Sequence, residues 1–461
     1  MEKRRFFDEP SSEGSFATLG KAFEKIPTAV LRACGWLLAA LLLVLLLAEA
    51  GFRTFGIAGT YTMGFVLLGT AAEVLTVLWI GKTLLDRKHC LRVRWTATDA
   101  ALMLMLIWCG LSTLCSDDPT AAFLGSDYRQ EGFGTYLIYA ALFFCCRRSC
   151  RERQTRILIW CICLVGMLLS VWAMLFASPF GEFAKTKFGP TVVWYNSVSA
   201  VFSNPNHFAY FLSMTILAAA GLFVTETSWC RCGLAATAYV IQTLMLLRNA
   251  TLGGYLAVLA GLILLLILSH VRKDGSAARV LMLLTILILF MLIQRYVGYD
   301  VSGDVHAAIK AFDTAEQIGS SDVLDKEAAM GSSGVDRLLM WKQAVQYTLR
   351  RPLLGHGADG SGVLHFCDTV EGSDRPHNEY LQYAVYFGIP GVLMYLTALV
   401  SLFVRCVRDV KRLSSACLVL GCMVFSYCAS AFVGNSMYYT TVYFVMILAL
   451  LVNESVRNME K

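Results

Sequence analysis

The chain has 461 residues, of which 57% are hydrophobic and 16% are charged, and its formal net charge is +6 at pH 7. A soluble domain could not bury so much apolar surface, so this composition excludes a soluble globular protein and predicts one that crosses a membrane many times. The positive charge fits basic loops that contact anionic lipid headgroups, and no basic-aromatic patch indicates nucleic-acid binding.

Apolar stretches long enough to cross about 30 Å of hydrocarbon follow one another along the chain. They lie near residues 30–50, 62–81, 97–114, 133–147, 157–178, 205–224, 233–248, 250–270, 277–298, 379–404, 414–432 and 436–453. The fourth stretch is short and the seventh and eighth almost touch, so we expect about twelve spans, within a range of ten to twelve. Because hydrocarbon offers no partner to backbone groups, each span should be an α-helix, which makes the fold all-α and polytopic.

Lys and Arg residues predict the orientation. Most of them fall in the N-terminal segment, in alternate loops near residues 82–96, 147–156, 224–232, 270–279 and 405–413, and at the C-terminus. The positive-inside rule places those segments, and both termini, in the cytoplasm. The predicted division is a cytoplasmic segment 1–29, membrane helices 30–298, an extracytoplasmic catalytic loop 299–378, membrane helices 379–453 and a cytoplasmic tail 454–461.

Sixteen cysteines are present, but their spacing forms neither a zinc site nor a regular disulfide pattern. Most lie in spans or on the predicted cytoplasmic side, where Cys behaves as a small apolar residue. Only Cys115 and Cys367 are expected at the outer face, where a bridge between them is a hypothesis. We expect neither a metal nor a cofactor.

Two spans begin at the predicted outer face with residues suited to anion binding. The sixth starts in "FSNPNHFAYFLSM", with Asn204 or Asn206 as the cap and His207 beside it, and the tenth starts with His377 and the capping residue Asn378. Free N–H groups and the helix dipole make such starts natural phosphate sites. The alternative is that each Asn only caps its helix and each His lies at headgroup depth.

The long polar loop between the ninth and tenth spans is large enough to suggest a function of its own. It carries a set of residues suited to an anionic substrate, namely Arg337, His356, His365, Asp374 and His377. Residues 305–318 are expected to form a short solvated helix.

An amphipathic helix is predicted within this loop over residues 336–350, with Trp341 among its apolar positions. Arg337 would lie in its first turn, where a cation opposes the helix dipole. This placement indicates an anionic partner, although Asp336 could supply that partner within the protein.

These residues resemble the bacterial O-antigen ligase and O-antigen polymerase family. The run of Arg337, Trp341, "PLLGHG" and "PHNEYLQYAVYFGIPG" is similar to its signature, and "LGSDYRQEGFGTYL" and "FSNPNHFAYFL" are similar to earlier elements. The resemblance extends from about residue 97 to 452. It implies a glycosyltransferase-C-like helical bundle that moves an oligosaccharide from undecaprenyl pyrophosphate to an acceptor hydroxyl, without a metal, at the outer face of the bacterial cytoplasmic membrane.

Such a transfer needs positive charge on the leaving diphosphate, and Arg337 is the first candidate to supply it. The family's second outward Arg falls at Leu252 in this chain. Arg248 could substitute for it or could simply extend toward the interface, and Arg129 could contact phosphate or form a salt bridge with Asp127 or Glu131.

His377 matches the family's functional histidine. It could accept the proton of the attacking hydroxyl, or only orient the acceptor or the leaving phosphate, and Asp374 and Glu379 are alternative bases. The predicted catalytic residues are therefore His377 and Arg337. The predicted substrate-binding residues are Arg248, Arg129, Asn378, Asn206, His207 and Trp341.

The sequence leaves polymerase and ligase activities open, and the acceptor can be a glycan, a lipid or a protein. A different class, a transporter or flippase of a polyprenyl-linked or other anionic substrate, would gather its charges and helix breaks near the bilayer midplane. Here the candidate residues collect at the outer boundary, which favours the enzyme.

Overall fold

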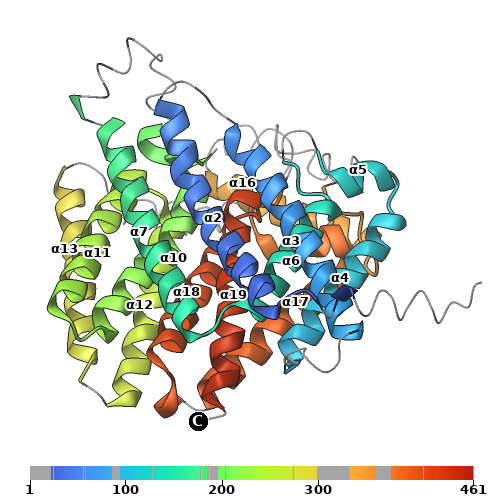
Figure 1. The fold of residues 1–461 in the computed structure, drawn as a ribbon. Helices are drawn as coiled ribbons and strands as arrows, with labels where there is room; N and C mark the ends of the chain where they lie inside the picture. Colours follow the sequence, from blue (N-terminus) through green and yellow to red (C-terminus); the bar gives the residue numbers. More distant parts are fainter. Residues whose placement is uncertain are drawn as a thin grey trace, which may run out of the picture.

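The computed structural model describes residues 25–54, 57, 59–85, 94–126, 129–176, 196–202, 204–273, 275–297, 333–359, 375–408 and 410–459, together with residues 22, 23, 178, 179, 181, 183 and 186. Within these residues the chain is a bundle of long helices (Figure 1). In chain order they are α2 (Thr28–Thr54), α3 (Thr60–Leu85), α4 (Ala97–Leu114), α5 (Pro119–Leu124), α6 (Phe133–Ser149), α7 (Glu152–Phe176), α10 (Pro205–Thr225), α11 (Trp229–Asn249), α12 (Leu252–Arg272), α13 (Ala277–Val297), α16 (Ser333–Arg350), α17 (Glu379–Arg408), the short 3-10 helix η1 (Val410–Arg412), α18 (Ser415–Ala431) and α19 (Tyr438–Asn458).

Each of the twelve predicted apolar stretches coincides with one helix. In the described part of the chain, ten helices are long and apolar enough to cross a membrane. The helix α18 is a shorter apolar one, and α6 has 17 residues. The prediction of an all-α polytopic membrane protein with ten to twelve spans is therefore confirmed.

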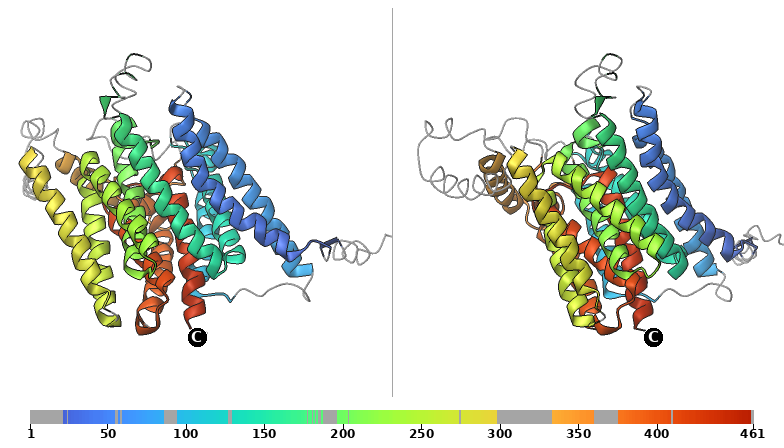
Figure 2. Two further views of the ribbon diagram at one scale, coloured as in Figure 1. Left: turned by 60° about the vertical axis from the view of Figure 1, so that its left-hand side comes forward. Right: turned by 90° about the vertical axis from the view of Figure 1, so that its left-hand side faces the viewer.

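The two ends of the bundle differ in what they carry. Figure 2 shows α16 at the end opposite the C-terminus, while the first residues of α2 lie at the same end as the C-terminus. The basic end of α6 also lies there, because Asn453 of α19 donates hydrogen bonds to the carbonyls of Cys146 and Cys150. The first residues of α2, the basic end of α6 and the C-terminus therefore lie at one end of the bundle.

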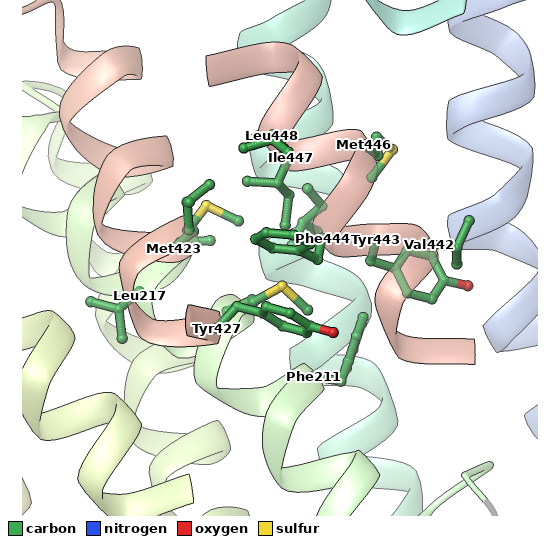
Figure 3. Packing of buried hydrophobic residues seen from close by; sticks show 14 of the residues in the cluster. Phe211, Leu217, Met423, Tyr427, Val442, Tyr443, Phe444, Met446, Ile447 and Leu448 are labelled. Atoms are coloured by element: carbon green, nitrogen blue, oxygen red, sulfur yellow. The ribbon is translucent and has the colours of Figure 1, made fainter. Parts of the chain in front are cut away.

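Three helices, α10, α18 and α19, form the centre. Of the 18-residue apolar segment of each helix, 89% is buried inside the protein in α10 and in α19. In α13 the buried share is 17%, so this helix faces outward. Aromatic rings join the central helices: Tyr427 stacks on Phe444 with ring centroids 4.1 Å apart, and Phe211 meets Tyr443 edge-on at 5.3 Å (Figure 3). This packing fixes the start of α10 and the end of α18 relative to each other.

The helix α17 is interrupted near its first third. Gly388 has a left-handed φ of +71°, and Pro390 follows, so the carbonyls of the preceding turn lose their helical partners. The segment after α16 supplies new ones: His356 N–H binds the Val385 carbonyl at 3.0 Å, and Gly357 N–H binds that of Tyr386 at 2.9 Å. The "PLLGHG" and "GIPG" motifs are thus two halves of one backbone interaction.

Glycine is required on the helix side of this interaction. A Cβ at Gly388 would overlap the carbonyl oxygen of Leu353, and the left-handed φ disfavours any other residue there.

We expect Gly388→Ala to destabilise the protein by about 2 kcal/mol or more, from backbone strain together with the overlap. The matched control is Gly421→Ala, because Gly421 lies inside α18 with open space around its Cβ position. Thermal unfolding of the detergent-purified variants measures the difference. Equal melting temperatures for the two variants would contradict this account of the α17 break.

Candidate active site

At the end of the bundle that carries α16, four segments far apart in the sequence converge. They are the loop between α5 and α6, the segment after α16, the residues before α17 and the loop between α18 and α19. The start of α10 joins them through Tyr210, whose hydroxyl donates to the Val433 carbonyl at 2.8 Å.

Arg375 is the common partner of these segments. Its side chain is fully buried, and Nη1 lies 2.9 Å from Oε2 of Glu131 while Nη2 lies 3.0 Å from Oδ1 of Asp359. Nη1 also donates to the Ser436 carbonyl at 2.7 Å. A buried guanidinium that binds two carboxylates and a carbonyl through Nη1 and Nη2 fixes the geometry around it.

The carboxylates extend the network. Oδ2 of Asp359 accepts hydrogen bonds from the backbone N–H groups of Ser126 and Glu131, at 2.9 and 3.2 Å. Oε1 of Glu131 accepts the Tyr139 hydroxyl at 2.7 Å. Burial raises the pKa of the Glu131 carboxyl, and the adjacent Arg375 charge offsets part of that rise.

His377 lies two residues beyond Arg375 on the half-exposed side of this network. Its φ of +50° is left-handed, a conformation that costs energy in a residue with a Cβ. Nδ1 lies 3.4 Å from Nδ2 of Asn435, in the loop between α18 and α19. The position of the His377 ring is therefore set by the left-handed backbone at His377 and by the contact with Asn435.

The first turn of α10 collects the remaining candidates. His207 is 4% exposed and lies edge-on to Tyr210 and Tyr439, with ring centroids 5.9 and 5.3 Å away. Arg129, His377 and Arg375 are close enough for their charges to act on His207. Arg337 and Glu379 are likewise close enough to act on Tyr210, one turn further along. The structure thus brings Arg337, His377, Arg129 and His207 to one end of α10.

The capping residues take the predicted positions. Asn378 caps α17, where its Oδ1 accepts the Leu381 N–H at 3.1 Å. At α10 the cap is Asn204, which accepts the Asn206 N–H at 2.8 Å, so Asn206 is the second residue of the helix.

The predicted helix in the long loop is present as α16, but it begins at Ser333 and not at residue 336. Arg337 therefore lies beyond the first turn, and the expectation that it opposes the helix dipole there is wrong. Its side chain is half-buried, as is that of Trp341. The indole Nε1 of Trp341 is buried without a hydrogen-bond partner among the described residues.

Two other predicted residues have different surroundings. His356 stacks on Tyr347 with ring centroids 4.0 Å apart, and its Nε2 lies 3.0 Å from the Tyr347 carbonyl. Burial lowers the pKa of the His356 imidazole, which favours the neutral ring. Arg248 is exposed at the end of α11 and lines a separate cavity with Phe290 and Gln294 of α13.

The Glu131 carboxylate, one alternative partner of Arg129, pairs with Arg375. Nη1 of Arg129 lies 3.7 Å from the Sδ atom of Met437. Several expectations fall outside the described residues: His365, Cys367, Asp374, Asp127 and the short helix 305–318. Cys115 lies exposed with a free thiol at the end of α4.

The fold and the converging loops define an all-α, multi-pass membrane protein with a polar cluster at one end. Residues 237–396 match the family model described as O-antigen ligase, which confirms the resemblance to the O-antigen ligase and polymerase family over that part of the chain. The match includes α16, Arg337, Arg375 and His377, and it indicates a glycosyltransferase-like enzyme of surface polysaccharide synthesis. No curated protein matches the chain.

Sequence reasoning missed the central role of Arg375, although it lies in the quoted motif before α17. Its partners Glu131 and Asp359 lie 244 and 16 residues away along the chain, and both are almost fully buried. Their combination of charge and burial was not visible in any local pattern. Asn435, which meets His377, belongs to a short loop that carried no motif.

Replacing Arg375 with Met should destabilise the protein by about 3 to 5 kcal/mol, because it leaves two buried carboxylates without a counter-charge. The matched control is Arg351→Met, which removes a solvent-exposed ion pair with Asp117 and should cost about 1 kcal/mol or less. Yield of monodisperse protein and its melting temperature report the difference. Similar behaviour of the two variants would refute the structural role of Arg375.

Proposed function

We propose that this protein transfers or polymerises an undecaprenyl-pyrophosphate-linked oligosaccharide onto an acceptor hydroxyl at the outer face of the bacterial cytoplasmic membrane. The observation that carries the proposal is the convergence of Arg337, Arg129, His377 and His207 at the start of α10, in a chain that matches O-antigen ligase. The acceptor is a glycan, a lipid or a protein.

The chemistry requires cations at the leaving group. When the sugar C1–O bond breaks, negative charge develops on the diphosphate, and a guanidinium can neutralise it with two parallel hydrogen bonds. Arg337 and Arg129 are the candidates for this role, because both are partly exposed while Arg375 is committed to its two carboxylates. In this proposal the arginines replace a metal ion.

A second observation supports a donor that carries a lipid. A cavity of about 510 Å³ lies among α3, α4, α6, α17 and α19, and its lining is largely apolar. At one end it reaches Tyr139 and Tyr395, whose hydroxyls donate to Glu131 and Glu379. An apolar chain in this cavity would end beside the polar cluster.

A transporter remains the alternative, and the broken helix α17 is a feature that transporters share. In this chain the freed carbonyls of Val385, Tyr386 and Phe387 accept hydrogen bonds from His356, Gly357 and Trp108. They are therefore not available to coordinate an ion or a substrate. This occupation favours the enzyme.

Purified protein supplied with an undecaprenyl-pyrophosphate oligosaccharide and an acceptor should release undecaprenyl pyrophosphate. Arg337→Ala and His377→Ala should each reduce release by about a hundredfold or more, since each removes a group that acts on the transition state. Lys342→Ala is the matched control, because Lys342 is an exposed cation on the same helix as Arg337. Unchanged release in both site variants would defeat the assignment.

The proposed orientation can be tested with the natural cysteines. Cys115 and Cys230 are both exposed, at the end of α4 and at the start of α11, and the orientation places them on opposite sides of the membrane. A membrane-impermeant maleimide applied to cells whose outer membrane, if they have one, has been opened should label Cys115 but not Cys230. Cys115→Ser and Cys230→Ser assign the signal, and labelling of Cys230 before lysis would reverse the topology.

A further inference from the structure

Asn435 lies between two anchored neighbours in the loop that connects α18 and α19. On one side the Tyr210 hydroxyl holds the Val433 carbonyl, and the Tyr210 ring lies so close to Gly434 that a Cβ there would overlap it. On the other side Ser436 N–H donates to Oε1 of Gln382 at 3.0 Å, and the Ser436 carbonyl accepts Arg375. Asn435 itself is only 3% exposed, so its amide has little freedom to move.

The contact between Asn435 and His377 restricts the protonation of the ring. Nδ2 of Asn435 lies 3.4 Å from Nδ1 of His377. With the amide oriented so that Nδ2 faces the ring, the amide is the donor and Nδ1 offers its lone pair, while Oδ1 of Asn435 is buried without a hydrogen-bond partner among the described residues. The neutral ring then carries its hydrogen on Nε2.

We propose that Asn435 is a positioning residue that holds His377 as the Nε2–H tautomer, so that His377 donates a hydrogen bond to the leaving diphosphate and is not the base. This inference rests on the proposed function. As the acceptor oxygen bonds to the sugar C1, the C1–O bond to the diphosphate breaks, and its electron pair stays on the diphosphate oxygen. The hydroxyl proton passes to the departing diphosphate, which balances the step.

Charged and titratable groups surround His377 on several elements. His207 faces it from α10, Arg129 lies in the loop before α6, and Arg375 and Glu379 belong to its own segment. Both arginines keep their charge at all relevant pH values. The Glu379 carboxylate accepts the hydroxyls of Tyr395 and Tyr427.

The first test replaces the hydrogen-bond donor at position 435 with an acceptor. In Asn435→Asp the carboxylate accepts a hydrogen from Nδ1, so a neutral ring loses the hydrogen on Nε2, and only the protonated ring carries both. We expect the ratio of variant to wild-type kcat/KM to be about tenfold higher near pH 6 than near pH 8. A purely structural role for Asn435 would give a ratio that does not change with pH, and that result overturns the proposal.

The second test substitutes amides for the ring. The side-chain amide of Gln can place an N–H near the position of Nε2, whereas that of Asn reaches only the position of Nδ1. His377→Gln should therefore retain measurable release, at least about tenfold above His377→Asn and His377→Ala. If His377 were the base, all three variants would lose activity equally, because no amide accepts a proton at these pH values.

The third test does not depend on activity. In protein labelled with ¹⁵N-histidine, the resonances that disappear in His377→Gln identify its ring, and their ¹⁵N shifts report which nitrogen carries the hydrogen. Hydrogen on Nε2 supports the proposal, and hydrogen on Nδ1 of the neutral ring overturns it. A wild-type protein that releases no undecaprenyl pyrophosphate would instead count against the proposed function, while the tautomer would still be measured.

Discussion

The buried guanidinium of Arg375 is the constraint on which the polar end of this protein depends. It meets Glu131, Asp359 and the Ser436 carbonyl at once, and so joins the loop before α6, the segment after α16 and the loop before α19. Desolvating three charges is costly and is offset only when every donor and acceptor is well placed. The cluster therefore tolerates little displacement, and it fixes the positions of the residues next to it in the three segments.

The same end of the bundle is stiffened by the break in α17. A helix that stops and restarts frees carbonyl groups, which cannot stay without partners in a region away from water. Here the segment from Pro352 to Gly357 donates to the Val385 and Tyr386 carbonyls and docks the end of α16 onto α17, and Trp108 donates to the Phe387 carbonyl. Both candidate catalytic residues are consequently positioned by α17. Arg337 lies on α16, which docks onto α17, and His377 lies just before the first residue of α17.

Much of the fold follows from the sequence because the bilayer imposes a simple rule on apolar stretches. All twelve stretches became helices, and Asn204 and Asn378 cap two of them as their positions suggested. The prediction for Arg337 rested on a helix start that was three residues off, since an amphipathic pattern locates a helix better than its first turn. Arg375 and Asn435 escaped notice because their partners lie in distant loops, whose pairing depends on the tertiary fold.

These observations separate two kinds of charged residue at the same site. Arg375 and Asp359 are sealed from solvent and pair with each other, whereas Arg129, Arg337 and His377 are each partly exposed. A group that binds a substrate anion must be within reach of solvent, and it needs rigid support to stay in place. Fully buried pairs provide that support, and the partly exposed groups around the first turn of α10 are within reach of a substrate.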